Sequence, residues 1–259
     1  MRILNKLWER FAGQKPSPAE TERDRVSKIL AKAEGSLRLG DLAGTANFCA
    51  QAEAMLAAEV DQSATVESRR LIGDANFDIG SLYRDIGKLE EAERAYRTAL
   101  RAWQELSAEE PDDVEFQERT AACFNHLGIL NGDRGKLDRA ESAYQSALSI
   151  RSDLQRAKFP TAEEGHRQNG VYLGGVLCNL GHIAARQGNI TSALEYYDRA
   201  NTTLLHSIPP CDCGCQLGIV HAISAATGRP HWIGLGHQFL ENVARGRAEL
   251  ASPRGGDEL

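Results

Sequence analysis

Apolar residues recur at helical spacing along most of the chain, and glycines interrupt them at regular intervals. Around Gly87 the apolar positions before the glycine are Ile72, Ala75, Ile79, Leu82 and Ile86, and those after it are Leu89, Ala92, Ala95, Tyr96, Ala99 and Trp103. Such spacing places apolar side chains on one face of a helix. Glycine suits the left-handed residue that ends a helix, because it has no Cβ. The pattern predicts two antiparallel helices joined by a tight turn.

This unit occurs four times, with turn glycines separated by 47, 48 and 53 residues. Small residues stand seven positions before each glycine and five and twelve positions after it, and a cysteine or tyrosine stands nine positions after it. In chain order these sets are Ala33, Gly80, Gly128 and Gly181; Gly40, Gly87, Gly135 and Gly188; Thr45, Ala92, Ala140 and Ala193; Cys49, Tyr96, Tyr144 and Tyr197; and Ala52, Ala99, Ala147 and Ala200. We interpret all of these as packing residues, small where two helices cross and aromatic beside the crossing.

Helix start signals between the units support the same division. They are Ser17 with Pro18 and Glu20, Asp113 with Glu115 after Pro111, and Thr161 with Glu164 after Pro160. The predicted helices are 17–38, 41–60, 64–86, 89–107, 112–133, 137–157, 161–186 and 190–207. We therefore expect an amphipathic segment at 1–16, four units within 17–207 (17–60, 64–107, 112–157 and 161–207), a cysteine-rich connector at 208–230, and a closing helix with a frayed tail at 231–259.

The third unit carries the signature Leu127-Gly128, Gly135, Ala140, Tyr144 and Ala147, which resembles the tetratricopeptide repeat. The usual repeat has about 34 residues, so each helix here is longer by about two turns. This resembles the long-helix variety of kinesin-light-chain-like and bacterial arrays. The resemblance implies an all-α, right-handed superhelical solenoid of antiparallel helix pairs. The first unit departs from the pattern at Ala33, Thr45 and Cys49, as terminal repeats often do.

The resemblance also implies that the first helix of each pair lines a concave groove that binds a protein or peptide. The groove candidates are Phe77, Ser81, Arg84, Asn125, Ile129, Asn179, His182 and Arg186. Asparagine suits this role because its amide can both donate to and accept from a peptide backbone. The cationic clamp with which some family members hold a carboxylate is absent, since only Asn179 matches it. The predicted function is non-catalytic binding of an unidentified protein or peptide.

Charge and composition argue against several other classes of function. The net charge of −6 and the lack of a strong Lys/Arg cluster argue against nucleic acid as a partner. No apolar run is long enough to span a bilayer, and we expect a cytoplasmic protein with reduced thiols. Gly132-Asp133-Arg134-Gly135-Lys136 lacks the glycine spacing and the hydroxyl residue of a phosphate loop. With no catalytic motif, the chain is predicted not to be an enzyme and to need no cofactor.

The alternative function is metal binding or thiol redox chemistry through Cys211, Cys213 and Cys215. Three thiols with nearby histidines are ligands for zinc or copper, but zinc sites usually separate paired cysteines by two or more residues. The apolar stripe within 3–11 predicts a helix that either caps the first unit or serves as a docking or membrane-surface helix. Trp232 begins a similar stripe, which predicts a helix over the last unit. Self-association through an edge of the solenoid is a further alternative.

Overall fold

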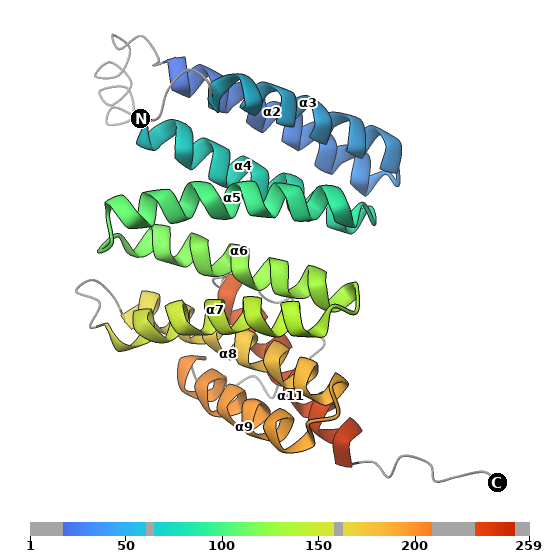
Figure 1. Ribbon diagram of the computed structural model, residues 1–259, viewed down its shortest axis with the longest axis vertical. Helices are drawn as coiled ribbons and strands as arrows, with labels where there is room; N and C mark the ends of the chain where they lie inside the picture. The colour runs from blue at the N-terminus through green and yellow to red at the C-terminus, as the bar shows by residue number, and fades with distance from the viewer. Residues whose placement is uncertain (1–17, 61–64, 158–162, 209–230, 252–259) are drawn as a thin grey trace, which may run out of the picture. The chain divides into compact units, whose positions relative to one another are not determined.

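The computed structural model describes residues 18–60, 65–157, 163–208 and 231–251, and all regular structure in these ranges is helical. The helices are α2 (Pro18–Arg38), α3 (Leu42–Val60), α4 (Val66–Asp85), α5 (Leu89–Glu109), α6 (Val114–Asp133), α7 (Leu137–Arg156), α8 (Glu163–Arg186), α9 (Ile190–Ser207) and α11 (His231–Ala251) (Figure 1). Each lies within a few residues of its predicted range. The all-α helical-repeat fold expected from the sequence is confirmed.

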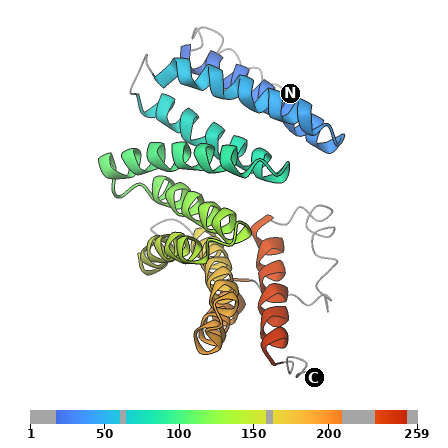
Figure 2. The same cartoon turned by 45° about the vertical axis from the view of Figure 1, so that its right-hand side comes forward.

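The chain divides into two compact units, which we describe separately. Unit 1 is Met1–Leu106 and holds α2, α3, α4 and most of α5. Unit 2 is Ser107–Leu259 and holds α6, α7, α8, α9 and α11. In unit 2 each helix packs on its neighbour along the chain, and α11 packs against both α8 and α9 (Figure 2). Of the helices that the model describes, none is both long and apolar enough to cross a membrane.

The four turn glycines adopt the left-handed conformation that the sequence predicted. Their φ angles are 75° at Gly40, 79° at Gly87, 70° at Gly135 and 80° at Gly188. After Gly87 the chain closes the helix with a bond from the Lys88 N–H to the Tyr83 carbonyl (2.8 Å). This six-to-one bond is the Schellman motif, which satisfies a carbonyl at the helix end. A side chain at these four positions would strain the turn that pairs the helices.

The helices cross where small residues face an aromatic ring. A Cβ added at Gly80 would lie 2.8 Å from the Tyr96 ring, and one added at Gly128 would lie 2.5 Å from the Tyr144 ring. In the first pair Ala33, Thr45 and Cys49 fill the corresponding positions, and all three are fully buried. The buried Thr45 hydroxyl is satisfied because it bonds to the Asp41 carbonyl (2.8 Å). The departures of the first unit therefore keep the same packing.

Two helices begin at a side chain that caps their N-terminus. Asp113 caps α6 by accepting a bond from the Phe116 N–H (3.2 Å), as its place after Pro111 predicted. Thr65 caps α4 in the same way, from Ser68 (3.2 Å). The predicted caps at Ser17 and Thr161 lie outside the described residues.

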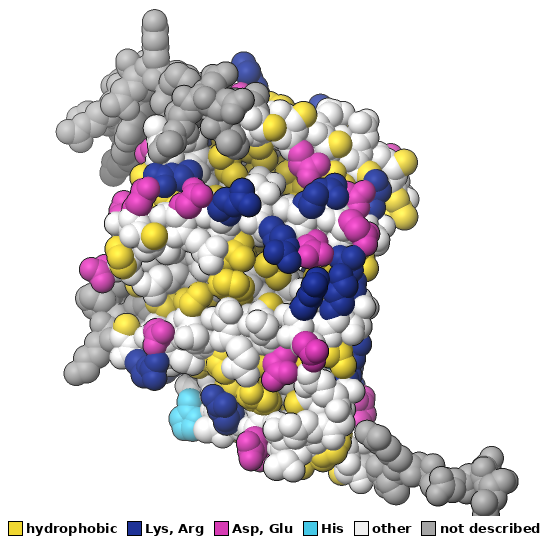
Figure 3. All heavy atoms as spheres, viewed as in Figure 1, with side chains coloured by type: hydrophobic (Ala, Val, Ile, Leu, Met, Phe, Trp, Pro, Cys, Tyr) yellow, Lys and Arg dark blue, Asp and Glu magenta, His cyan; other side chains and the backbone are white. Residues whose placement is uncertain are grey.

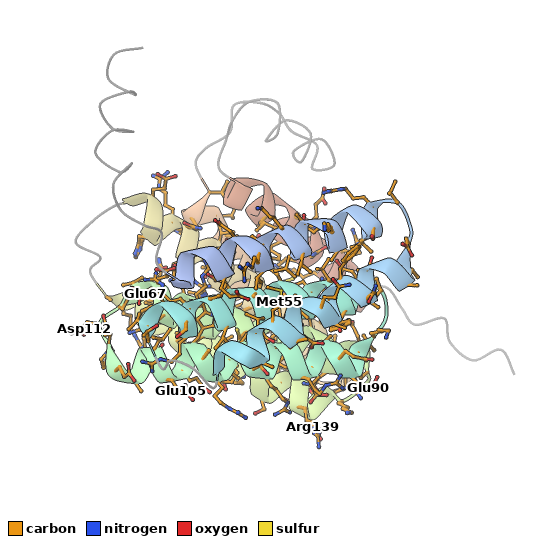
Figure 4. The ribbon with its side chains drawn as sticks, turned by 90° about the horizontal axis from the view of Figure 1, so that it is seen from above. Met55, Glu67, Glu90, Glu105, Asp112 and Arg139 are labelled. Atoms are coloured by element: carbon orange, nitrogen blue, oxygen red, sulfur yellow. The ribbon has the colours of Figure 1, made fainter. Side chains whose placement is uncertain are left out.

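Charged side chains lie on the surface of the helices. Glu90 and Glu105, for example, are exposed at the outer side of unit 1 (Figure 4). Acidic and basic side chains intermingle on the face shown in Figure 3, without one sign prevailing.

Candidate functional site

In unit 2 the first helices of two successive pairs, α6 and α8, lie side by side and run in the same direction. The Asn179 Nδ2 donates to the Asn125 Oδ1 (3.1 Å), and the Arg186 Nη1 donates to the Gly132 carbonyl (2.8 Å). Both bonds join residues 54 positions apart, so the two helices are parallel and in register. The glycines Gly128 and Gly181 face α7 and α9. We call the side that carries the α6–α8 contacts the inner face of unit 2; it comprises Asn125, His126, Ile129, Asp133, Asn179, His182 and Arg186.

The paired amides of Asn125 and Asn179 are the most distinctive polar feature of this face. Both residues are half-buried. Their mutual bond uses one lone pair of Asn125 and one N–H of Asn179, and each amide has two lone pairs and two N–H groups. The pairing therefore fixes the orientation of both side chains and leaves each with further capacity to bond a ligand. The neighbouring His126 turns its Nδ1 toward the Ala122 carbonyl of its own helix (2.9 Å).

His182 lies deeper in the same face, against the second helix of its pair. Its ring meets Tyr197 edge-on, with centroids 5.4 Å apart, and its Nδ1 is 4.0 Å from the Cys178 sulfur. Burial lowers the pKa of His182, because the cation is poorly solvated there; Glu249 opposes this effect and Arg245 adds to it. The imidazole is therefore neutral at neutral pH and offers one donor and one acceptor.

Ile129 and Arg186 complete the inner face. Ile129 is half-buried and packs on the core of unit 2. Arg186 is exposed, and one of its nitrogens donates to the Gly132 carbonyl. The rest of its guanidinium group faces solvent. Asp133, next to it on α6, is exposed as well. Together these side chains offer an apolar spot, two amides and charges of both signs on a rigid pair of helices.

The other three candidates, Phe77, Ser81 and Arg84, lie on α4 in unit 1. The Phe77 ring meets Tyr96 at 5.6 Å, and the Ser81 hydroxyl is 3.0 Å from the Tyr96 hydroxyl. Arg84 is half-buried and pairs with Asp85 (3.1 Å). Phe77 and Ser81 thus also hold α4 to α5, a packing role that the sequence did not reveal. The other five candidates all lie in unit 2: Asn125, Ile129, Asn179, His182 and Arg186.

A buried arginine on α7 is a feature that the sequence did not predict. Arg151 is 5% exposed, and it donates to Asn169 Oδ1 (3.1 Å) and to the Glu118 carbonyl (3.2 Å). Its guanidinium lies 4.8 Å from the centre of the Tyr172 ring. Glu118 also forms an ion pair with it at 3.5 Å. The group joins α6, α7 and α8, and we assign it a structural role because the buried guanidinium already bonds to partners on α6 and α8.

The cysteines that the structure describes are unsuited to nucleophilic or metal chemistry. Cys49, Cys123 and Cys178 are buried free thiols. Burial raises the pKa of the Cys49 thiol to about 11 and that of Cys178 to about 12, so both stay protonated at neutral pH. Within the described ranges no three His, Cys, Asp or Glu side chains come together as metal ligands. Cys211, Cys213 and Cys215 lie outside those ranges.

A cleft of about 350 Å³ opens on another side of unit 2, among α7, α8 and α9. Its lining is Ser152, Leu173, Leu177, Asp198, Arg199, Thr202 and Thr203. Both threonine hydroxyls donate to carbonyls of their own helix, and Asp198 pairs with Arg247. Few polar groups are therefore left to converge on a ligand, and the inner face is the better candidate site.

Comparison with known proteins agrees with the geometry. Two tetratricopeptide-repeat family models match, one over residues 71–153 and one over residues 175–202. No curated protein matches the chain significantly. The solved structures that resemble it include a putative kinesin light chain with nearly identical tetratricopeptide-like repeats from Podosopora anserina, with a TM-score of 0.52, 13% identity, and coverage of 89% of this chain and 99% of that one.

A second similar structure is the apo form of RapI, with a TM-score of 0.52, 12% identity, and coverage of 93% of this chain and 88% of that one. At these identities the likeness concerns the fold alone. The matched repeats, the left-handed turn glycines and the small-residue crossings agree with one another. The chain contains tetratricopeptide repeats, which the family models match over residues 71–153 and 175–202.

Proposed function

We propose that the chain is a non-catalytic scaffold that binds an extended protein or peptide segment along the inner face of unit 2. The family and the fold suggest a protein-interaction scaffold in general terms, and the comparisons give no support to the metal or redox alternative. The proposal rests chiefly on one observation, the hydrogen-bonded pair Asn125 and Asn179 on two parallel helices.

The chemistry of the pair suits a peptide backbone. An extended segment presents alternating N–H and C=O groups, and a side-chain amide can serve both. Because the two amides already hold each other, little side-chain freedom is lost on binding, which reduces the cost of association. Ile129 offers an apolar contact beside them, and His182 contributes an uncharged polar ring. We include Phe77, Ser81 and Arg84 on unit 1 as a separate set of candidate contacts.

The setting that we propose is cytoplasmic. The three described cysteines are free thiols, as expected in a reducing compartment. The partner that we propose is a protein or peptide, since the inner face mixes amides, an apolar side chain and both charges and has no basic stripe for nucleic acid.

Selection from a random-peptide library displayed on phage tests the proposal. Peptides selected on the full chain should lose roughly tenfold or more in affinity for an Asn125→Ala, Asn179→Ala variant, because each lost amide bond is worth about 1 kcal/mol. Ser149→Ala, an exposed change on α7, is the matched control and should bind as the parent does. Failure to select any peptide, or equal affinity for the double variant, would overturn the proposal.

A further inference from the structure

Helix α3 exposes a side that carries no charge. The exposed residues Ala43, Asn47, Ala50, Ala54 and Ala57 recur at helical spacing opposite the buried Thr45, Cys49, Ala52 and Leu56. We call these five exposed residues the outer face of α3, and Leu42, which is 51% exposed, borders its first turn. The charged residue between Leu42 and Ala57 is Glu53, which accepts a hydrogen bond from the Tyr83 hydroxyl of α4 (2.9 Å).

The second helices of the other three pairs differ from α3 at the equivalent positions, counted from the turn glycine. These positions hold Glu90, Arg94, Arg97, Arg101 and Gln104 on α5; Asp138, Ser142, Gln145, Ser149 and Ser152 on α7; and Thr191, Glu195, Asp198, Thr202 and Leu205 on α9. All of them except Ser152 are exposed. Each of these helices therefore shows solvent at least one charge where α3 shows four alanines and an asparagine. A helix that is largely apolar all round is typically covered all round, so we expect the outer face of α3 to be covered.

The small side chains of the outer face limit what can cover it. Alanines leave room for a partner with large apolar side chains, just as Gly80 leaves room for the Tyr96 ring within a helix pair. Two copies of the outer face would meet through methyl groups and bury little apolar area, and the stabilisation scales with that area. The outer face therefore fits a helix with large apolar side chains better than it fits a second copy of itself.

The segment before α2 carries side chains of this kind. Its large apolar residues recur at helical spacing, and its charged residues fall on the other side of the same helical pattern. The apolar set is Ile3, Leu4, Leu7, Trp8 and Phe11, and the charged set is Arg2, Lys6, Glu9 and Arg10. The segment thus has three basic residues and one acidic residue, whereas α3 has two acidic residues, Glu53 and Glu59, and no basic one. The two charge distributions are complementary.

The length of the chain allows this contact. Helices α2 and α3 form an antiparallel pair with a short turn, so α2 begins beside the last turn of α3. From Phe11 to Pro18 the chain can span up to about 24 Å. The outer face from Ala43 to Ala57 is about 21 Å long, so the apolar residues of the segment can reach it.

We propose that residues 3–11 form an amphipathic helix that docks on the outer face of α3 with its large apolar side chains. This contact lies within unit 1 and is independent of peptide binding by unit 2. The docked helix buries the alanines of α3 and leaves its own charged residues in water. It takes the place that charged side chains of α5 take on their own helix.

Hydrogen–deuterium exchange of the full chain, read by mass spectrometry, tests the proposal. The amides of residues 3–11 should exchange roughly tenfold or more slowly than those of a synthetic peptide of the same sequence. In Ala50→Arg, Ala54→Arg this protection should be lost, because the outer face then carries the two arginines that α5 has at these positions. The matched control Ser142→Arg, Ser149→Arg, at exposed positions of α7, should keep it.

Changes within the segment supply the reciprocal test. Leu7→Ser, Trp8→Ser removes large side chains from the apolar side and should abolish the protection of residues 3–11. Lys6→Ser, on the charged side, should leave it unchanged. Arginine is a good helix former, so α3 should stay folded in its double variant, and circular dichroism checks this.

Each other outcome overturns the inference. Free exchange of residues 3–11 in the parent would mean that the segment does not dock. Protection that persists in Ala50→Arg, Ala54→Arg would mean that another surface holds the segment. A dimer found by light scattering that this double variant dissociates, with residues 3–11 exchanging freely in both proteins, would mean that a second copy covers the outer face.

Discussion

The crossing of α6 and α7 at Gly128 allows the packing of the repeat to be tested by a single methyl group. In Gly128→Ala the new Cβ would lie 2.5 Å and 2.6 Å from two atoms of the Tyr144 ring, which is 4% exposed. A well-packed ring cannot move aside freely, and overpacking of this kind costs about 1–3 kcal/mol. Alanine in a helix gains about 0.5–1 kcal/mol over glycine. The two effects combine to a net loss of about 0–2.5 kcal/mol in the free energy of unfolding.

Gly132→Ala is a matched control four residues further along the same helix. There the nearest atom to a new Cβ is the Ile183 Cδ1 at 3.5 Å, an ordinary contact. This variant should be as stable as the parent or up to about 1 kcal/mol more stable. Urea unfolding followed by circular dichroism measures both. Combining Gly128→Ala with Tyr144→Leu should cost less than the two changes added together, because the smaller side chain relieves the clash. Equal stability of Gly128→Ala and Gly132→Ala would refute the packing argument.

Three further predictions concern buried polar groups. Because burial lowers the pKa of His182, the unfolded chain binds its proton more readily, so the free energy of unfolding should fall as the pH drops below about 6.5. Urea midpoints measured across this range should vary less with pH in His182→Gln than in the parent, and an unchanged pH dependence would contradict the burial of the imidazole. Arg151→Ala should lower the free energy of unfolding by about 2–3 kcal/mol, because the buried Oδ1 of Asn169 loses its donor. The exposed Arg156→Ala should cost less than about 0.5 kcal/mol, and equal losses would contradict the structural role of Arg151. Cys178 should resist alkylation in the folded chain at neutral pH and react after unfolding, as read by peptide mass spectrometry, since burial raises its pKa to about 12; modification at the rate of a free thiol would refute its burial.

Much of the fold could be predicted because its signals are local. The left-handed turn within each helix pair needs a glycine, and the crossing of the two helices needs a small residue facing an aromatic ring. The roles of Gly87 and Gly128 could therefore be predicted from the sequence. The predicted helix bounds were also close to those in the structure, because Thr65 and Asp113 lie directly before the helices that they cap. The first unit departs from the pattern and still packs alike, because Thr45 finds a carbonyl for its hydroxyl.

The candidate site was less predictable because its contacts join distant residues. The bond between Asn125 and Asn179 spans 54 positions and depends on how two helices align, which local periodicity does not encode. Arg151 is buried through partners on two other helices, whereas a charged residue in a helix is ordinarily expected at the surface.

Site-specific photo-crosslinking tests the central proposal, that the inner face of unit 2 binds peptide, most directly. A benzophenone amino acid is placed at Asp133, which is exposed on the inner face, or at Ser149, which is exposed on α7, and each protein is irradiated with the tightest selected peptide. Crosslinking through position 133, competed by unlabelled peptide and absent at position 149, is the predicted result. Crosslinking at position 149 without any at position 133 would contradict the account.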